Sequence, residues 1–152
     1  MRRLRLYADT SVFGGYFDDE FSGDSRKLFT EIEAGRFLLV VSATTLRELR
    51  RAPQQVRQLI TDLPVDAVET LPPLEEIERL RDAYLEAEVV GSSAALDAEH
   101  IASASVAGVD LIVSWNFKHI VNFERIRGYH AVNLKEGYHP IEIYSPREVI
   151  ES

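Results

Sequence analysis

The stretch that decides the fold is LRLYADTSVFGG, residues 4–15. Leu4, Leu6 and Ala8 form an alternating apolar run that is typical of a strand, and this run stops at Asp9. A carboxylate at the end of a strand has two interpretations. Asp9 either caps a short helix that begins near Thr10 or is the first part of a functional site.

Strand-like and helical segments alternate along the rest of the chain. Apolar runs typical of strands occur at 4–8, 37–41, about 65–68, 109–113 and about 129–132. Helical stretches occur at about 23–35, 44–62, 73–88 and 93–107. This order predicts an α/β fold, a three-layer α/β/α sandwich with a central, mostly parallel sheet. Ligands of such open sheets lie beyond the carboxyl ends of the strands.

Length and composition indicate one domain over residues 1–152, in which residues 141–152 add a short strand and a short helix. A capping box, Ser145-Pro146-Arg147-Glu148, predicts that helix. The composition, 45% apolar and 28% charged, excludes a disordered chain. The chain has no cysteine, which excludes disulfides, thiolate metal sites and a cysteine nucleophile. No signal peptide or membrane span is recognisable, so we predict a cytoplasmic protein that does not contact a membrane.

The net charge of −8 is concentrated in one segment. Residues 66–99 hold ten acidic and two basic side chains, which leaves fifteen of each sign elsewhere. Two basic stretches of the neutral remainder are candidates for contacts with phosphates. Their candidate nucleic-acid-binding residues are Arg47, Arg50, Arg51 and Lys118. The alternative for each stretch is a solvated helix face.

Polar residues recur where strands are predicted to end. Asp9 follows the first strand, Glu48 lies in the first turns of the helix after the second, and Asn116 and His119 follow the fourth. Each has a structural alternative. Glu48 closes a capping box with Thr45, Asn116 caps a turn, and His119 is a structural histidine.

Asp97 is harder to explain structurally. Helical spacing over residues 91–108 places it on a face of small and apolar residues, with His100 beside it. No lysine or arginine lies within one helical turn of Asp97. Burying a polar group without a partner destabilises a protein by roughly 2–7 kcal/mol, and burying an unpaired carboxylate destabilises it by more. A divalent cation shared by Asp97, Asp9 and Glu48 would stabilise it.

The set of motifs resembles the PIN domain, particularly the VapC-like ribonucleases. The resemblance rests on ADTSVF at 8–13, TTLREL at 44–49 and DAEHIASASVAGVDLIVSWNFKHI at 97–120, and it spans nearly the whole chain. It implies a metal-dependent ribonuclease, with Mg²⁺ or Mn²⁺ as cofactor. It also implies that Asp9, Glu48 and Asp97 are metal ligands and catalytic residues, with Asn116 as a further catalytic residue.

The sequence departs from the family pattern at one position. Many of these nucleases have another aspartate shortly after the asparagine, whereas this chain has Phe117-Lys118-His119. His119 is therefore a candidate metal ligand, and an imidazole ligand would favour Mn²⁺ over Mg²⁺.

The resemblance also implies partners. The substrate would be single-stranded or loop RNA, with Trp115, Tyr16 and Phe17 either as stacking surfaces or as core residues. VapC-like proteins often act as toxins held by an antitoxin, and they often form homodimers. Two other functions stay open, a PIN-like binding or scaffold module with weakened catalysis and a phosphotransfer domain with an aspartate nucleophile.

Overall fold

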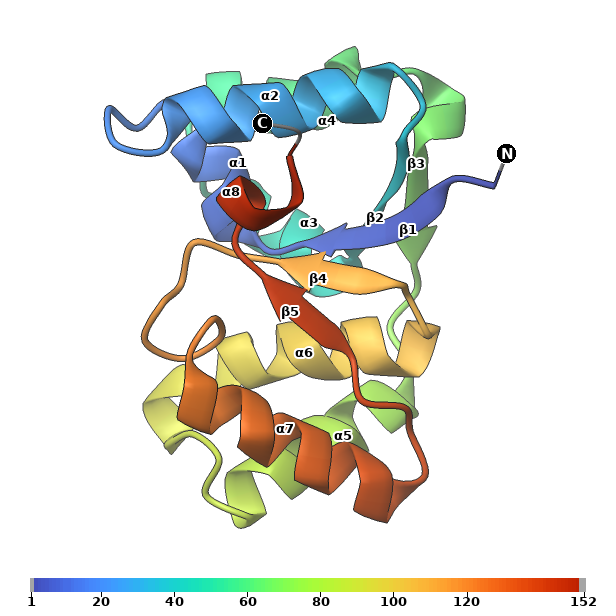
Figure 1. The fold of residues 1–152 in the computed structure, drawn as a ribbon, viewed down its shortest axis with the longest axis vertical. Coiled ribbons are helices and arrows are strands. Elements are labelled where there is room, and N and C mark those ends of the chain that lie inside the picture. The colour runs from blue at the N-terminus through green and yellow to red at the C-terminus, as the bar shows by residue number, and fades with distance from the viewer. Residues whose placement is uncertain (1, 151–152) are drawn as a thin grey trace.

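The five strands form one parallel sheet with the order β3-β2-β1-β4-β5 (Figure 1). The structure is a computed structural model that describes residues 2–150, so residues 1, 151 and 152 of the predicted domain lie outside the described residues. The strands are β1 (Leu4–Ala8), β2 (Phe37–Ser42), β3 (Val68–Leu71), β4 (Leu111–Val113) and β5 (Glu142–Tyr144). Every pair of neighbouring strands is parallel, which confirms the predicted sheet.

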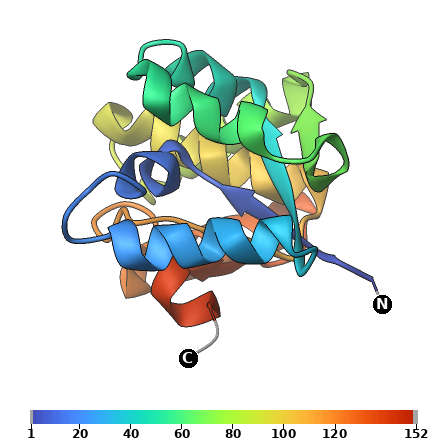
Figure 2. The ribbon, with the colours of Figure 1, turned by 90° about the horizontal axis from the view of Figure 1, so that it is seen from above.

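Helices cover both faces of the sheet, as predicted. One layer contains α1 (Thr10–Gly15), α2 (Ser22–Glu33) and α4 (Gln54–Asp62), and Figure 2 looks down onto it. The other layer contains α5 (Glu75–Glu86), α6 (Ala95–Ala107) and α7 (Phe123–Glu136) (Figure 1). Two short helices, α3 (Ala43–Leu49) and α8 (Pro146–Val149), directly follow β2 and β5. Within residues 2–150, no helix has the length and apolarity that crossing a membrane requires.

The alternation in β1 separates two hydrophobic cores. Leu6 and Ala8 pack with the α1, α2 and α4 layer, and Tyr7 between them packs with the α5, α6 and α7 layer. All three side chains are buried because β1 is the central strand, with β2 on one side and β4 on the other. The end of β1 therefore lies in the middle of the carboxyl edge of the sheet.

One predicted strand is wrong. Residues 129–132 belong to α7, in which Tyr129, Val132 and Asn133 are buried at helical spacing. Asn122 begins this helix by accepting a hydrogen bond from the Arg125 backbone, and Gly137 ends it with a φ of 89°. The fifth strand is β5, which lies in the region of the predicted short strand at 141–144.

Other boundaries shift for local reasons. The helix predicted over 44–62 is two helices, because the chain turns before Pro53 and Arg57 donates to the Arg50 and Ala52 carbonyls at the end of α3. The strand predicted at 65–68 begins only at Val68, after a 3₁₀ turn over Val65–Ala67. The terminal capping box is present, with the Ser145 backbone donating to Glu148.

A close packing contact fixes α1 against the end of β4. A Cβ atom added at Gly15 would lie 2.7 Å from Trp115 Nε1 and 2.9 Å from Ser25 Oγ, which hydrogen-bond to each other. Gly14, one residue earlier in the same helix, has open space at its Cβ position.

We therefore predict that Gly15→Ala destabilises the protein by roughly 1–3 kcal/mol through overpacking. Gly14→Ala is the matched control and should be neutral or stabilising, by up to about 1 kcal/mol, because alanine favours the helix. Urea unfolding followed by the fluorescence of the single tryptophan measures both variants. Equal effects of the two substitutions would contradict this account.

Candidate active site

Asp9 lies at the centre of the site, where β1 and β4 end side by side. Ala8 pairs with Val113, so the next residues, Asp9 and Ser114, are neighbours. Ser114 Oγ donates to Asp9 Oδ2 over 2.7 Å, and Ser11 Oγ donates to Asp9 Oδ1 over 2.6 Å. Asp9 occupies the N-cap position of α1, but its side chain makes no capping hydrogen bond, so the helix-cap interpretation is wrong for the carboxylate.

The charge of Asp9 is held in an unfavourable environment. The side chain is almost fully buried, and burial raises the pKa of Asp9 above its ordinary value. The positive charge of His100 and the hydroxyls of Ser11 and Ser114 lower this pKa, and the negative charge of Asp97 raises it further. The net direction is upward, so a cation close to Asp9 would favour its ionised form.

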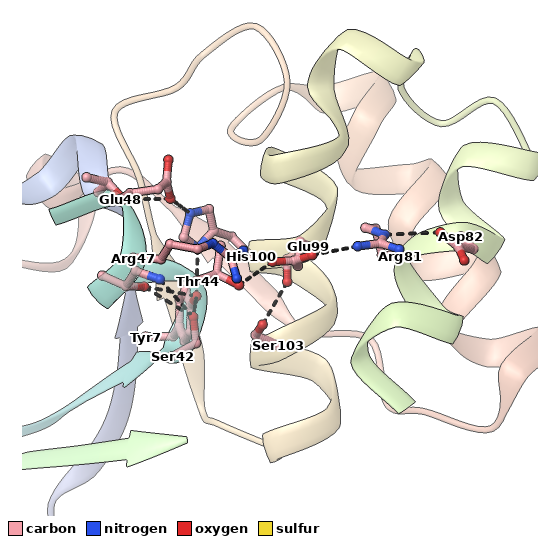
Figure 3. A network of polar contacts seen from close by, with 12 residues as sticks. Tyr7, Ser42, Thr44, Arg47, Glu48, Arg81, Asp82, Glu99, His100 and Ser103 are labelled. Atoms are coloured by element: carbon pink, nitrogen blue, oxygen red, sulfur yellow. Dashed lines mark hydrogen bonds and ion pairs between the residues drawn. The ribbon is translucent and has the colours of Figure 1, made fainter. Parts of the chain in front are cut away.

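Glu48 reaches the site from α3. The N-cap of this helix is Ser42, whose side chain accepts from the Thr45 backbone, so Glu48 does not complete a capping box with Thr45. Instead, Glu48 Oε1 accepts from Thr10 Oγ1 over 2.8 Å and from His100 Nε2 over 2.5 Å (Figure 3). Burial raises the pKa of Glu48, but the hydrogen bonds and charge of its partners outweigh burial, and the net pKa is lowered.

His100 connects Glu48 to the central strand, a role that the sequence analysis did not find. Its ring is buried, with Nδ1 2.6 Å from the hydroxyl of Tyr7 and Nε2 bound to Glu48. Burial lowers the pKa of His100, but its contacts with Tyr7, Glu48 and Asp9 together raise the pKa of His100 to about 10. The only sequence signal was a histidine three residues after Asp97 in an alanine-rich helix.

Asp97 lies in the first turn of α6 and is less isolated than predicted. Its side chain is 25% exposed, and its Oδ2 lies 3.1 Å from His119 Nδ1. The expectation of a buried carboxylate without a partner is therefore wrong, because the partner comes from the loop after β4. His119 does reach this part of the site.

Asn116 shapes the loop that carries His119. Its Oδ1 accepts from the backbone N–H groups of Lys118, over 3.1 Å, and His119, over 2.9 Å. The turn-capping role that was one of its two interpretations is present. Asn116 thus holds His119 near Asp97.

The carboxylates can contribute to a metal site but do not form a ready-made one. In the described part of the chain, no group of three Asp, Glu or His side chains is placed to hold a metal ion together. The donors are nevertheless the oxygens that Mg²⁺ and Mn²⁺ prefer, and Mg²⁺ commonly uses one or two carboxylates with water completing its shell. A cation would also offset the repulsion between Asp9 and Asp97. The donor chemistry therefore fits either cation.

The candidate RNA-binding residues divide into two groups. Arg47 and Arg51 line a groove together with Glu48 and Leu96. Arg50 and Lys118 are exposed but do not line this groove.

The aromatic residues also differ in exposure. Trp115 is buried and stacks on Phe21 with ring centroids 4.2 Å apart, so it is a core residue. Tyr16 is partly buried against Phe29, whereas Phe17 is 37% exposed. Of the three proposed stacking residues, Phe17 offers the most accessible ring.

The contacts of His100 predict a stability that depends on pH. An unfolded histidine titrates near 6.5, and the fold raises this pKa to about 10, so the stabilisation is complete below pH 6.5 and is lost as the pH rises toward 10. The difference in free energy of unfolding between the wild type and His100→Gln should therefore shrink by roughly 2–5 kcal/mol over this range. Urea denaturation in EDTA measures it, with His139→Gln at an exposed position as control. A constant difference would contradict an imidazolium at position 100.

Comparison with known proteins identifies the fold. No model of a known protein family matches the sequence, and neither does any curated protein sequence. The structure is similar to the crystal structure of VapC20 from Mycobacterium tuberculosis, a toxin that cleaves the sarcin–ricin loop. The TM-score is 0.58 at 15% identity, covering 74% of this chain and 91% of VapC20. Tyrosyl-tRNA synthetase from Aeropyrum pernix aligns with a TM-score of 0.49 at 13% identity, over 95% of this chain and 52% of its own, and carries no argument. The chain has a PIN-like α/β fold with a five-stranded parallel sheet.

Proposed function

We propose that this protein is a metal-dependent ribonuclease that hydrolyses RNA phosphodiesters. One observation carries the proposal: Asp9, Glu48 and Asp97 come from three separate elements, and all three carry charges that act on one another or on the shared His100. The negative charge of Asp97 raises the pKa of Asp9, so bringing these two carboxylates together costs stability. The PIN-like fold, which VapC20 shares, supports the same conclusion.

Asp9, Glu48 and Asp97 would hold Mg²⁺ or Mn²⁺, and His119 is a candidate for a further ligand. When bound, the cation supplies a water of lowered pKa and offsets the charge that develops on the phosphate. The neighbouring groups of this chain orient the ligands. Ser11 and Ser114 hold the Asp9 carboxylate by its two oxygens.

The same residues prepare the site for an anionic substrate. His100 and Thr10 bind one oxygen of Glu48 and thereby direct the carboxylate. Asn116 is proposed as a further catalytic residue, and it also orients the turn that carries His119. Four basic residues are proposed to contact RNA phosphates: Arg47, Arg50, Arg51 and Lys118. Arg47 and Arg51 line the same groove as Glu48, and Lys118 lies in the loop after β4.

The toxin role, an antitoxin partner, a homodimer and a cytoplasmic location complete the proposal, and they rest on the resemblance to VapC proteins. One observation favours the scaffold alternative: His119 stands where many PIN-domain nucleases have an acidic residue. The phosphotransfer alternative is less well supported, because Asp9 is 3% exposed and both of its oxygens accept hydrogen bonds.

The first test is cleavage of a labelled mixed-sequence RNA in Mg²⁺, Mn²⁺ or EDTA. We expect cleavage that requires metal and falls by about 100-fold or more in Asp97→Asn, because a carboxylate that stabilises the reacting charge is lost. Asp62→Asn, an exposed residue at the end of α4, is the matched control for a contaminating nuclease and should match the wild type. Activity that is equal in all three proteins would leave the scaffold function as the better account.

The second test concerns the metal preference. If His119 is a ligand, Mn²⁺ should support faster cleavage than Mg²⁺, and His119→Asp should shift the ratio of the two rates toward Mg²⁺, since carboxylate oxygen suits the harder ion. Mn²⁺ should also raise the melting temperature of the wild type more than that of His119→Ala. A ratio that is unchanged in both variants would remove His119 from the ligand set.

A further inference from the structure

A network of buried charge lies next to the candidate metal ligands and makes no hydrogen bond to them among the described residues. Its centre is Glu99 on α6, whose side chain is 9% exposed (Figure 3). Thr44 Oγ1 and Arg47 Nη2 donate to its Oε2, the latter over 3.1 Å, and Arg81 Nη1 donates to its Oε1 over 2.7 Å. Glu99 therefore holds α3 at two points one turn apart.

The two arginines of this network differ in what they offer to solvent. Arg81 is 25% exposed and also binds Asp82, so its role is to neutralise Glu99 within the protein. The side chain of Arg47 is 56% exposed. Within residues 2–150, its ion pair with Glu99 uses only the Nη2 atom of the guanidinium. A guanidinium carries five donors, so Arg47 keeps donors for an anion from solution.

Arg47 lines two cavities of opposite character. The cavity on one side, about 230 Å³, includes the carboxylates of Glu75, Glu78 and Glu99 in its lining. This charge repels a phosphate. The groove on the other side, about 270 Å³, is lined by Arg47, Arg51, Leu96 and Glu48. Two guanidiniums and an apolar side chain suit an anionic ligand with an apolar part.

We propose that this groove is a subsite for one nucleotide of single-stranded RNA, and that Glu99 is the positioning residue of Arg47. The phosphate binds Arg47 and Arg51, and the base lies against Leu96, which is 47% exposed. The inference rests on the proposed ribonuclease function, because Glu48 belongs both to the groove and to the candidate metal ligands. The subsite would thus hold the nucleotide next to the phosphate that is cleaved.

The ion pair with Glu99 restricts the side chain of Arg47 before the substrate binds. A free arginine loses side-chain entropy when it binds an anion, whereas one that is already held loses less. Glu99 keeps Arg81 and Thr44 as partners when Arg47 is removed, so Arg47→Ala should fold normally. Substitution of Arg47 therefore reports on RNA binding rather than on a buried charge left alone.

The experiment measures both binding and cleavage of a fluorescent single-stranded RNA oligonucleotide, over a series of salt concentrations. Binding is followed by anisotropy in EDTA and cleavage in Mn²⁺. The proteins are the wild type, Arg47→Ala, Glu99→Gln, their double variant and Arg79→Ala, which removes an exposed arginine of α5. Thermal unfolding of each variant confirms that it is folded.

In Arg47→Ala we expect KM and Kd to rise about tenfold or more while kcat changes less, since a charge-assisted contact to the phosphate is lost. The slope of log Kd against log salt should decrease by about 0.7, the value for one phosphate contact on a single strand. Glu99→Gln should raise KM by a smaller factor and add little in the double variant, because it acts through Arg47. Arg79→Ala should behave like the wild type.

The outcomes separate the two proposals. RNA that is cleaved with an unchanged KM and salt slope in Arg47→Ala overturns the subsite and leaves the ribonuclease function intact. RNA that is bound with an Arg47-dependent salt slope but not cleaved supports the subsite and overturns the ribonuclease function. RNA that the wild type neither binds nor cleaves overturns both. Effects of Glu99→Gln that simply add to those of Arg47→Ala overturn the positioning role.

Discussion

The burial of the Asp9 carboxylate at the end of the central strand is the constraint on which the arrangement of the candidate site depends. Asp9 is nearly buried at the end of the central strand, and the negative charge of Asp97 acts on it. In a low-dielectric environment each such charge makes the next more costly to ionise. The groups around these carboxylates reduce this cost by hydrogen bonding and by opposite charge.

The groups that stabilise the carboxylates come from several separate elements of the chain. The hydroxyls of Ser11 and Ser114 donate hydrogen bonds to Asp9, and the positive charge of the buried His100 lowers the pKa of both Asp9 and Glu48. One residue before His100 in α6, Glu99 forms ion pairs with Arg47 and Arg81. Consecutive residues 99 and 100 therefore fasten the same helix, α3, by two separate charge pairs, which fixes Glu48 relative to α6.

The sequence was most informative where periodicity and strand order decide the structure. Alternation in β1 and the continuous apolar runs of β2 and β4 predicted the parallel sheet, and the polar residues after those strands predicted where Asp9, Glu48 and Asn116 lie. It failed at residues 129–132, because a short apolar run does not distinguish a strand from the buried face of a helix. The sequence also could not predict contacts between residues that lie far apart in the chain. The contacts of His100 with Tyr7 and of Asp97 with His119 join residues 93 and 22 positions apart, which no local spacing reveals.

The pairing of β1 with both β2 and β4 has a consequence for biosynthesis. β1 is the first strand to be made, yet its second edge stays unpaired until Leu111–Val113 have been synthesised. Contacts of such long sequence separation form late, since loop closure has to precede them. Asp9 gains Ser114, and Asp97 gains His119, only at this stage of folding. A chain on the ribosome thus lacks the assembled carboxylate site until the segment from Leu111 to His119 has emerged, and any activity that the site supports begins only after that point.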